Sequence, residues 1–311
     1  MKRVHVVAAV IERGDDILIA RRPDHVHQGG KWEFPGGKVE SGEAVEIALA
    51  RELEEELGIR VTEAKPLITI AHDYPDKQVL LDVWRVSQFA SEPHGMEGQE
   101  VRWVAAESLS EYEFPAANVP IVAAARLPSA YVITPELDGA AEEFVAALRS
   151  LMEQGYRLFQ LRLKACEPEV LAELVARIGQ LRTEFGAIVL VNCDMPAKFH
   201  SNLDGVHLTS AQLNRLNERP QNVEWVAASC HNLAEIQKAE ALGVDFVTLS
   251  PYRKTQSHPE MAPIPAEDFM LWVRAAKVPV YALGGLCLED EPLLNSMGAQ
   301  GVAGIRGFWP K

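Results

Sequence analysis

The chain has 311 residues, a length typical of two domains of ordinary size. Hydrophobic residues make up 48% and charged residues 24% of the chain, as in globular proteins, so a hydrophobic core is readily buried. The formal net charge of −14 disfavours a nucleic-acid polymer as partner, because an acidic surface repels polyanions, and a small phosphorylated substrate would need a local cation such as a divalent metal.

The first predicted domain, residues 1–127, surrounds one long helix with strands. A helix is predicted over residues 43–57, because Leu49, Leu53 and Leu57 recur at a spacing of four and a glycine follows the last leucine. The other predicted elements are a hairpin of strands at 4–11 and 17–21, strands at 79–86 and 100–104, and a short helix at 117–126.

The second predicted domain, residues 130–311, repeats a short apolar strand followed by a helix or loop. Eight such repeats favour a (β/α)₈ TIM barrel, so the fold class of the whole chain is α/β. The predicted strands cover residues 131–134, 159–163, 188–192, 205–208, 225–228, 245–249, 280–283 and 301–305. The predicted helices between them cover residues 140–154, 169–185 and 233–242.

Residues 37–59 carry the motif with the clearest chemical meaning. Glu52, Glu55 and Glu56 stand at positions i, i+3 and i+4, so one face of the predicted helix presents three carboxylates. Hard carboxylate oxygens on a rigid helix suit Mg²⁺ or Mn²⁺, which can bridge to substrate phosphates. The segment matches G-x5-E-x7-R-E-U-x-E-E-x-G-U, where U is aliphatic, at all seven fixed and both aliphatic positions. It resembles the Nudix box, and this complete match favours a metal site over a merely solvated acidic helix.

The resemblance to Nudix hydrolases implies an α/β/α sandwich with a mixed sheet and a Mg²⁺-dependent attack of water on a diphosphate. Glu52 or Glu55 would orient or deprotonate the water, and both alternatives stay open. The residue set implied by the resemblance consists of the catalytic group Glu43, Arg51, Glu52 and Glu55 and the metal ligands Gly37 (through its carbonyl), Glu52, Glu56 and Glu97.

Outside this motif the first domain resembles the MutT branch, the 8-oxo-dGTP diphosphatases that sanitise the nucleotide pool in DNA repair. The matching stretches are R-R at 21–22, W-E-F-P-G-G-K at 32–38, D-Y-P-D at 73–76, E-G-Q at 97–99 and F-P-A-A-N at 114–118. The implied products are a nucleoside monophosphate and pyrophosphate.

The same resemblance implies how the substrate is bound. Asn118 would hydrogen-bond the purine edge near Phe34, since one amide offers a donor and an acceptor. Without its context, Asn118 is more typical of a helix N-cap. Arg22 would contact the base or sugar, Lys38 would face the phosphates, and Tyr74 would keep an aromatic ring for stacking.

Residues 130–308 resemble the thiamine-phosphate synthase and TenI family. The matching stretches are Y-V-I-T at 131–134, Q-L-R-L-K at 160–164, D-G-V-H-L at 204–208, S-C-H-N at 229–232 and A-L-G-G-L at 282–286. All but the first end near the carboxyl ends of predicted strands, where barrel enzymes build their sites. The implied site for a phosphorylated ligand consists of Gln160, Arg162, Lys164, Asn192, Ser250, Gly284, Gly285 and Gly304.

The barrel also departs from that family at its expected metal ligands. Cys193 follows Asn192 where the family has an aspartate, and Asp194 comes one residue late. The acidic pair expected after Leu208 is replaced by a run that ends at Gln212, and the pyrophosphate loop is replaced at 252–258. We therefore expect no full synthase activity. Ligand binding or residual tautomerase chemistry on one side, and an inert scaffold on the other, both remain open.

Two further functions compete with 8-oxo-dGTP hydrolysis. The fusion of the two domains favours an alternative in which the first domain cleaves thiamine-related or damaged pyrimidine pyrophosphates. A binding or sensor protein with an inactive site is disfavoured by the intact carboxylate set of residues 37–59.

The four cysteines, Cys166, Cys193, Cys230 and Cys287, are widely spaced and form no C-x-x-C pair. This spacing disfavours disulfide and zinc frameworks and favours reduced thiols. No apolar run reaches the roughly 18 residues of a membrane span. We therefore expect a cytoplasmic protein without a membrane partner, and its oligomeric state stays open.

Overall fold

The computed structural model describes residues 3–26, 28–74, 78–163, 165–199, 202–255 and 260–310. Two compact units divide the chain, Met1–Arg126 and Leu127–Lys311. Within the described ranges, no helix combines the length and the apolar character that crossing a membrane requires.

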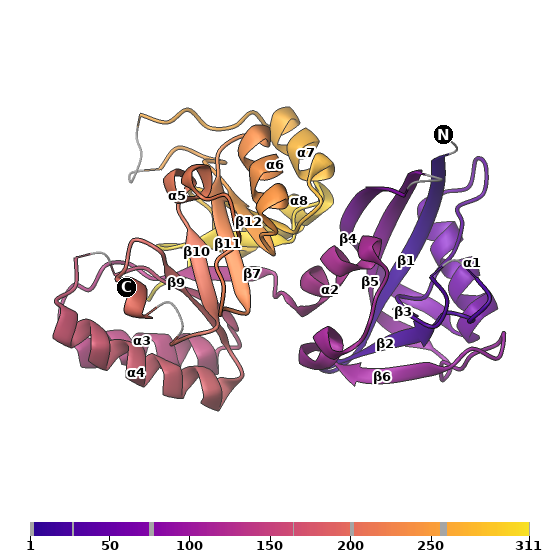
Figure 1. Ribbon diagram of the computed structural model, residues 1–311, viewed down its shortest axis with the longest axis horizontal. Helices are drawn as coiled ribbons and strands as arrows, with labels where there is room; N and C mark the ends of the chain where they lie inside the picture. The colour runs from indigo at the N-terminus through magenta and orange to yellow at the C-terminus, as the bar shows by residue number, and fades with distance from the viewer. Residues whose placement is uncertain are drawn as a thin grey trace. The chain divides into compact units, whose positions relative to one another are not determined.

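A mixed sheet forms the centre of the first unit (Figure 1). Its strands are β1 (Arg3–Arg13), β2 (Asp16–Arg21), β3 (Trp32–Glu33), β4 (Arg60–Asp73), β5 (Gln78–Ala90) and β6 (Val101–Ala105). Their order is β3-β2-β1-β5-β4, and β6 pairs with β2. β1 and β5 run parallel, whereas β1 and β2 form the predicted antiparallel hairpin.

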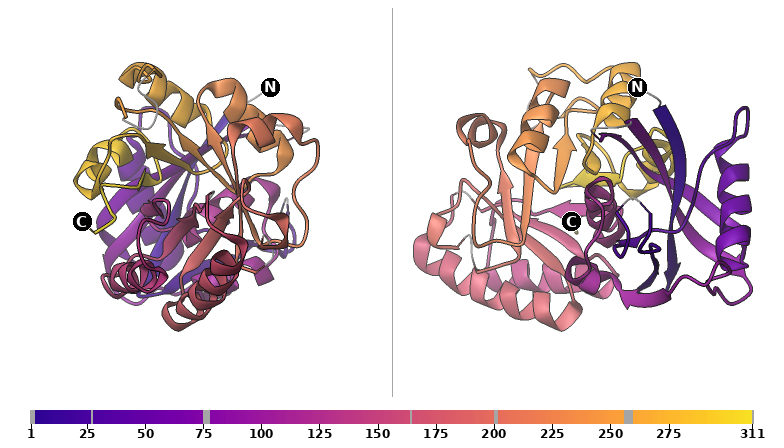
Figure 2. Two further views of the ribbon diagram at one scale, coloured as in Figure 1. Left: turned by 90° about the vertical axis from the view of Figure 1, so that its left-hand side faces the viewer. Right: turned by 45° about the vertical axis from the view of Figure 1, so that its right-hand side comes forward.

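Helices cover both faces of this sheet, as Figures 1 and 2 show. On one face Val7, Ala9 and Ile11 of β1 pack in the cluster that contains the leucines of α1 (Val45–Leu57). The intervening residues, such as Val10, point to the opposite cluster, which includes residues of α2 (Val119–Arg126). This alternation is the period of two expected for a central strand. The predicted α/β/α sandwich with a mixed sheet is confirmed.

Helix α1 begins at Val45, two residues later than predicted, and ends at Leu57. Leu49, Leu53 and Leu57 are buried on the sheet, with exposed fractions of 2%, 0% and 0%. Gly58 adopts φ 68°, and its N–H donates to the carbonyl of Glu54. This left-handed residue closes the helix, as the glycine in the sequence predicts.

Strand β4 is the main element that the sequence pattern did not predict. It lies at an edge of the sheet, and its pairing with β5 shifts register at three places, one of them between Pro66 and Ile68. Proline is tolerated on edge strands and at bulges, and the shifts interrupt the alternation that normally identifies a strand. The short strand β3 was also missed.

The second unit is a closed barrel of parallel strands, and its predicted TIM-barrel fold is confirmed. Most observed strands lie within a residue or two of the predicted ranges. In the described part of the chain, the strands around the barrel are β7 (Ala130–Ile133), β8 (Leu158–Leu161), β9 (Ile188–Asn192), β10 (Gly205–Leu208), β11 (Trp225–Cys230), β12 (Phe246–Leu249), β13 (Val280–Leu283) and β14 (Gly301–Gly304).

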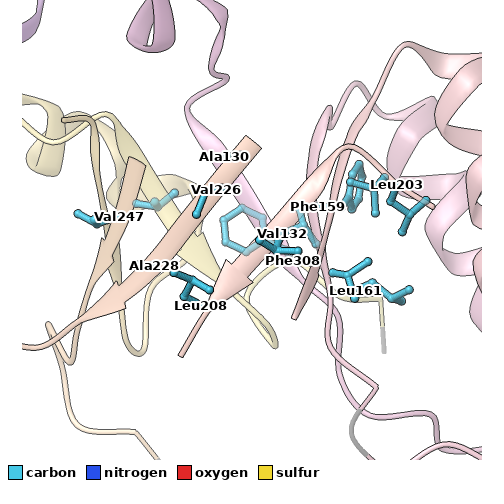
Figure 3. Close-up of a cluster of buried hydrophobic side chains, with 14 of the residues drawn as sticks. Ala130, Val132, Phe159, Leu161, Leu203, Leu208, Val226, Ala228, Val247 and Phe308 are labelled. Carbon is cyan, nitrogen blue, oxygen red and sulfur yellow. The ribbon is translucent and has the colours of Figure 1, made fainter. Parts of the chain in front are cut away.

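Figure 3 shows side chains of the barrel strands, such as Val132, Phe159 and Val226, in a buried cluster that also contains residues of the barrel helices. Val132 and Phe159, for example, share this outer core with Phe144 and Leu148 of the first barrel helix. Inside the barrel, the rings of Tyr131 and Phe246 lie with centroids 5.4 Å apart. The helices are α3 (Ala141–Glu153), α4 (Pro168–Phe185), α5 (Ser210–Arg215), α6 (Leu233–Leu242), α7 (Ala266–Ala275) and α8 (Glu291–Ser296).

The burial of α1 predicts how substitutions along this helix affect stability. Leu53→Ala removes a fully buried side chain, so we expect it to destabilise the first unit by about 2–5 kcal/mol. Urea unfolding of that unit, followed by hydrogen exchange of α1 peptides, measures the change. Ile47→Ala on the same helix is the control, because Ile47 is 62% exposed. An equal loss in both variants would contradict the packing described above.

Candidate active site and barrel cavity

Arg51 ties together the carboxylates at the start and middle of α1. Its Nε and Nη2 each donate to Glu43 at 2.9 Å, and its Nη1 donates to Glu52 at 2.8 Å and to Glu55 at 3.3 Å. Nη2 also donates to the carbonyl of Lys38 at 3.0 Å. The hydrogen bonds from Arg51 lower the pKa of the Glu43 carboxyl. Arg51 thereby joins the helix to the loop that precedes it.

The turn at Gly36 and Gly37 lies directly against two glutamates of α1. The Gly36 N–H donates to Glu56 Oε2 at 3.0 Å. A Cβ on Gly37 would stand 2.0 Å from Glu52 Oε2, and a Cβ on Gly36 would stand 2.1 Å from the carbonyl oxygen of Val7. Only glycine therefore permits this approach of backbone to carboxylate.

Glu56 lies at the centre of an acidic group. Burial, and then the charges of Glu33, Glu52 and Glu97, raise the pKa of its carboxyl to about 8 against the Gly36 hydrogen bond. Among the residues that the structure describes, no three His, Cys, Asp or Glu side chains are arranged so that they could together hold a metal ion. The donor chemistry nevertheless fits a hard divalent cation, because carboxylates and the Gly37 carbonyl supply oxygen ligands and a cation would offset their repulsion.

Aromatic and amide groups gather on the face of the sheet away from α1. Phe34 is 3% exposed, and its ring stacks on Phe114 with centroids 5.3 Å apart. Tyr74 packs against the same cluster. Asn118 is 8% exposed, and within the described residues its side-chain amide makes no hydrogen bond, to the N–H groups of α2 or elsewhere. The N-cap interpretation is thus unsupported, and the amide can receive a ligand.

Arg22 and Lys38 differ in how they are held. Arg22 forms an ion pair with Glu33, whose pKa is raised by burial in spite of that partner. The Lys38 side chain is exposed, and its backbone carbonyl accepts from Arg51. Sequence reasoning missed the part of Glu33 in the acidic group. Its only signal was its place in the W-E-F-P-G-G-K stretch.

A cavity of about 1070 Å³ opens at the carboxyl ends of the barrel strands. It brings together the predicted ligand residues that the structure describes, and Lys164 lies outside the described residues. Those lining residues are Gln160, Arg162, Asn192, Ser250, Gly284, Gly285 and Gly304. The cavity is also lined by Glu136 and His231, which the prediction did not include.

Buried polar side chains form a chain of contacts beneath this cavity. Tyr131 Oη lies 3.0 Å from His207 Nδ1, and His207 Nε2 lies 2.9 Å from Ser229 Oγ. Gln160 donates to Tyr131 at 3.2 Å, and Asn192 donates to Gln160 at 3.4 Å. Burial lowers the pKa of His207 to about 3, so its ring is neutral at physiological pH. This floor can therefore offer hydrogen bonds without a charge.

The expected metal carboxylates of the barrel are absent from their places. At the first place Cys193 carries a thiol, whose pKa burial raises to about 12. At the second, the side chain of Gln212 donates to Asp194 at 3.2 Å, and Asp194 is also held by the bond from its N–H to Asn192 at 3.0 Å. These residues do not fit a resident Mg²⁺.

Comparisons with known proteins agree with the division of the chain into two units. A family model described as thiamine monophosphate synthase matches residues 130–308, and a NUDIX domain model matches residues 6–124. The first unit is 37% identical over 124 residues to the 8-oxo-dGTP diphosphatase of Escherichia coli, a match that covers 40% of this chain and 96% of that protein. The chain is a Nudix hydrolase joined to a member of the thiamine monophosphate synthase family.

Two further relatives match this Nudix hydrolase, one in each of its two units. The CTP pyrophosphohydrolase of Escherichia coli is 39% identical over 124 residues, covering 40% of this chain and 92% of that protein. A protein of Aquifex aeolicus provisionally named thiamine-phosphate synthase 2 is 33% identical over 183 residues, covering 58% of this chain and 98% of its own. The predicted enzyme class is confirmed, and the base that the Nudix unit selects is a separate question.

The depressed pKa of His207 predicts a pH dependence of barrel stability. An unfolded histidine has a pKa of about 6.5, so below that value the unfolded chain binds a proton that the folded barrel excludes until about pH 3. Stability is therefore lost as the pH falls through this window, by about 2 kcal/mol between pH 7 and pH 5.

Urea unfolding of the barrel at pH 7 and pH 5 tests this dependence. His207→Gln should remove that part of the pH dependence, because glutamine does not titrate. Asn192→Ala, which changes a neighbouring group that does not titrate, should keep it. An unchanged pH dependence in His207→Gln would show that other groups are responsible.

Proposed function

We propose that the Nudix unit is a divalent-metal-dependent pyrophosphohydrolase that converts 8-oxo-dGTP into 8-oxo-dGMP and pyrophosphate. The observation that carries this proposal is that Glu52 and Glu56 lie against the turn at Gly36 and Gly37, with the charge of Glu97 acting on Glu56. These groups would supply oxygen ligands for a cation that neutralises the phosphates. The buried Asn118 amide, which makes no hydrogen bond within the described residues, supports recognition of a purine edge.

Each group at this site has a place in the reaction. Mg²⁺ or Mn²⁺, held by the Gly37 carbonyl, Glu52, Glu56 and Glu97, would neutralise the charge of the diphosphate. Arg51 holds Glu52 and Glu55 in place. One of these two carboxylates takes a proton from water as the water oxygen bonds to phosphorus, and the bond from that phosphorus to the bridging oxygen breaks. Lys38, whose side chain is exposed, would face the phosphates.

The groups proposed to recognise the base lie on the face of the sheet away from α1. An amide that pairs with a substrate edge is left unsatisfied by the wrong base, and this loss is a strong source of discrimination. Phe34 is stacked on Phe114 and almost fully buried, so it supports the wall of the base site more than it exposes a stacking surface. Arg22, which pairs with Glu33, would contact the base or sugar.

A substrate panel tests the proposal on the full chain with Mg²⁺. We expect kcat/KM for 8-oxo-dGTP to exceed that for dGTP, CTP and thiamine diphosphate, by about tenfold or more. Asn118→Ala should reduce this preference, whereas Glu52→Gln should abolish turnover of every substrate. A preference for CTP or thiamine diphosphate would instead support the alternative of pyrimidine or thiamine-related pyrophosphates, which the resemblance to a CTP pyrophosphohydrolase keeps in view.

We also propose that the barrel binds a small phosphorylated ligand without performing the full synthase reaction. The observation that favours binding is the single cavity that unites the described ligand residues. Gly284 and Gly285 line the cavity with φ 121° and 66°, and a Cβ on either would meet residues 251–254, so glycine lets these two segments approach each other at the cavity. Residual tautomerase chemistry is compatible with the same cavity.

Calorimetric titration of the full chain with thiamine monophosphate and with inorganic phosphate tests barrel binding. EDTA in the buffer keeps a metal-bound Nudix unit from contributing. We expect binding that Arg162→Met weakens by at least about tenfold, because Arg162 lines the cavity and a charged hydrogen bond is worth about 1.5–3 kcal/mol. Arg149→Met is the control, since Arg149 pairs with Glu184 at the helix surface. No heat with either probe would favour an inert scaffold.

A further inference from the structure

The loop between β5 and β6 is fastened to the end of helix α1. The N–H of His94 donates to the carbonyl of Leu57 at 3.1 Å, and the N–H of Met96 donates to the carbonyl of Glu56 at 2.9 Å. The last carbonyls of a helix have no partner within it, so they are free to accept from elsewhere. The loop that carries Glu97 uses these acceptors, one of which belongs to Glu56 itself.

Gln99 completes this attachment with both ends of its side-chain amide. Its Nε2 donates to the Glu56 carbonyl at 3.0 Å, and its Oε1 accepts from the Glu97 N–H at 2.9 Å. One planar group therefore links the backbone of Glu56 to the backbone of Glu97. Within the described residues, no hydrogen bond or ion pair holds the Glu97 carboxylate itself. Its position depends on the backbone.

The turn around Glu97 is shaped to accept this amide. The N–H of Gly98 donates to the carbonyl of Gly95 at 3.1 Å, and Gly98 adopts φ 80°. A Cβ on Gly95 would stand 2.0 Å from the backbone oxygen of Gln99 and 2.9 Å from its Oε1. The absence of a side chain at Gly95 lets Gln99 close over the turn, and Glu97 is left at its exposed tip.

We propose that Gln99 is a positioning residue that holds Glu97 within reach of the cation bound by Glu52 and Glu56. This inference rests on the proposed function, because it takes Glu97 as a metal ligand. Linking the two backbones requires a donor and an acceptor on one side chain of this length. Glutamate offers no donor to the Glu56 carbonyl, and methionine offers neither group.

The Mg²⁺ dependence of turnover by the full chain tests the role of Gln99, with whichever nucleotide the wild type hydrolyses best. Gln99→Met should raise the Mg²⁺ concentration for half-maximal rate about tenfold, the lower end of the effect of residues that orient metal ligands. The rate at saturating Mg²⁺ should largely recover. Mn²⁺ titration followed by electron paramagnetic resonance, without substrate, should show the same shift. If neither measurement shows a shift, the proposal is overturned.

Two other variants separate positioning from a general loss of structure. Gln99→Glu keeps the length and the acceptor, so it should fold like the wild type and still shift the Mg²⁺ dependence. Gln88→Met is the matched control, because Gln88 also donates from its amide, but to Glu63 across the pair of strands β4 and β5 and not to Glu56 or Glu97. An equal shift in Gln88→Met would overturn the proposal.

A double-mutant cycle with Glu97→Gln decides whether Gln99 acts through Glu97. If it does, Gln99→Met adds little to the shift already caused by Glu97→Gln. Additive shifts, or a shift in Glu97→Gln alone, overturn the positioning role and leave the proposed metal site intact. If Glu97→Gln causes no shift, the assignment of Glu97 as a metal ligand is overturned, and the positioning role of Gln99 is overturned with it.

Discussion

Repulsion among the carboxylates around Glu56 is the constraint on which the first unit depends. Burial first, and then the charges of three nearby glutamates, raise the pKa of the Glu56 carboxyl to about 8. Such a group stays together only if the backbone that carries it is rigid. Rigidity comes from the leucines that fix α1 to the sheet, from the hydrogen bond of Arg51 to Glu52, and from the hydrogen bond of the Gly36 N–H to Glu56. The same repulsion is what a divalent cation would relieve.

Strand β1 positions both halves of this arrangement. Its N–H groups at Val7 and Ala9 donate to the carbonyls of Gly37 and Pro35 at 2.9 and 2.8 Å, so the glycine turn is held like an added strand. The side chains of the same two residues pack in the cluster with Leu53. One strand thus sets the distance between the turn and the helix. A shift of register in β1 would separate the Gly37 carbonyl from Glu52.

The parts of the fold that follow a strict period were predictable from the sequence, and the contacts between distant segments were not. Regular apolar spacing predicts helix α1 and the barrel strands, whereas Pro66 and the register shifts obscure the pattern of β4. The spacing of Glu52 and Glu56 indicates a shared face. Nothing in that spacing places Glu33 beside them or assigns Gln99 two backbone partners, because those contacts arise only when separate loops meet.

The barrel presents the opposite balance between charge and structure. Its floor buries His207, Gln160 and Asn192, and buried polar groups cost free energy unless they are bonded. Here they satisfy one another through Tyr131 and Ser229, which keeps the floor polar but uncharged. An apolar filling would stabilise a pure scaffold equally well. A neutral polar floor beneath an open cavity is instead the arrangement that suits a ligand whose own charge sits elsewhere, on its phosphate.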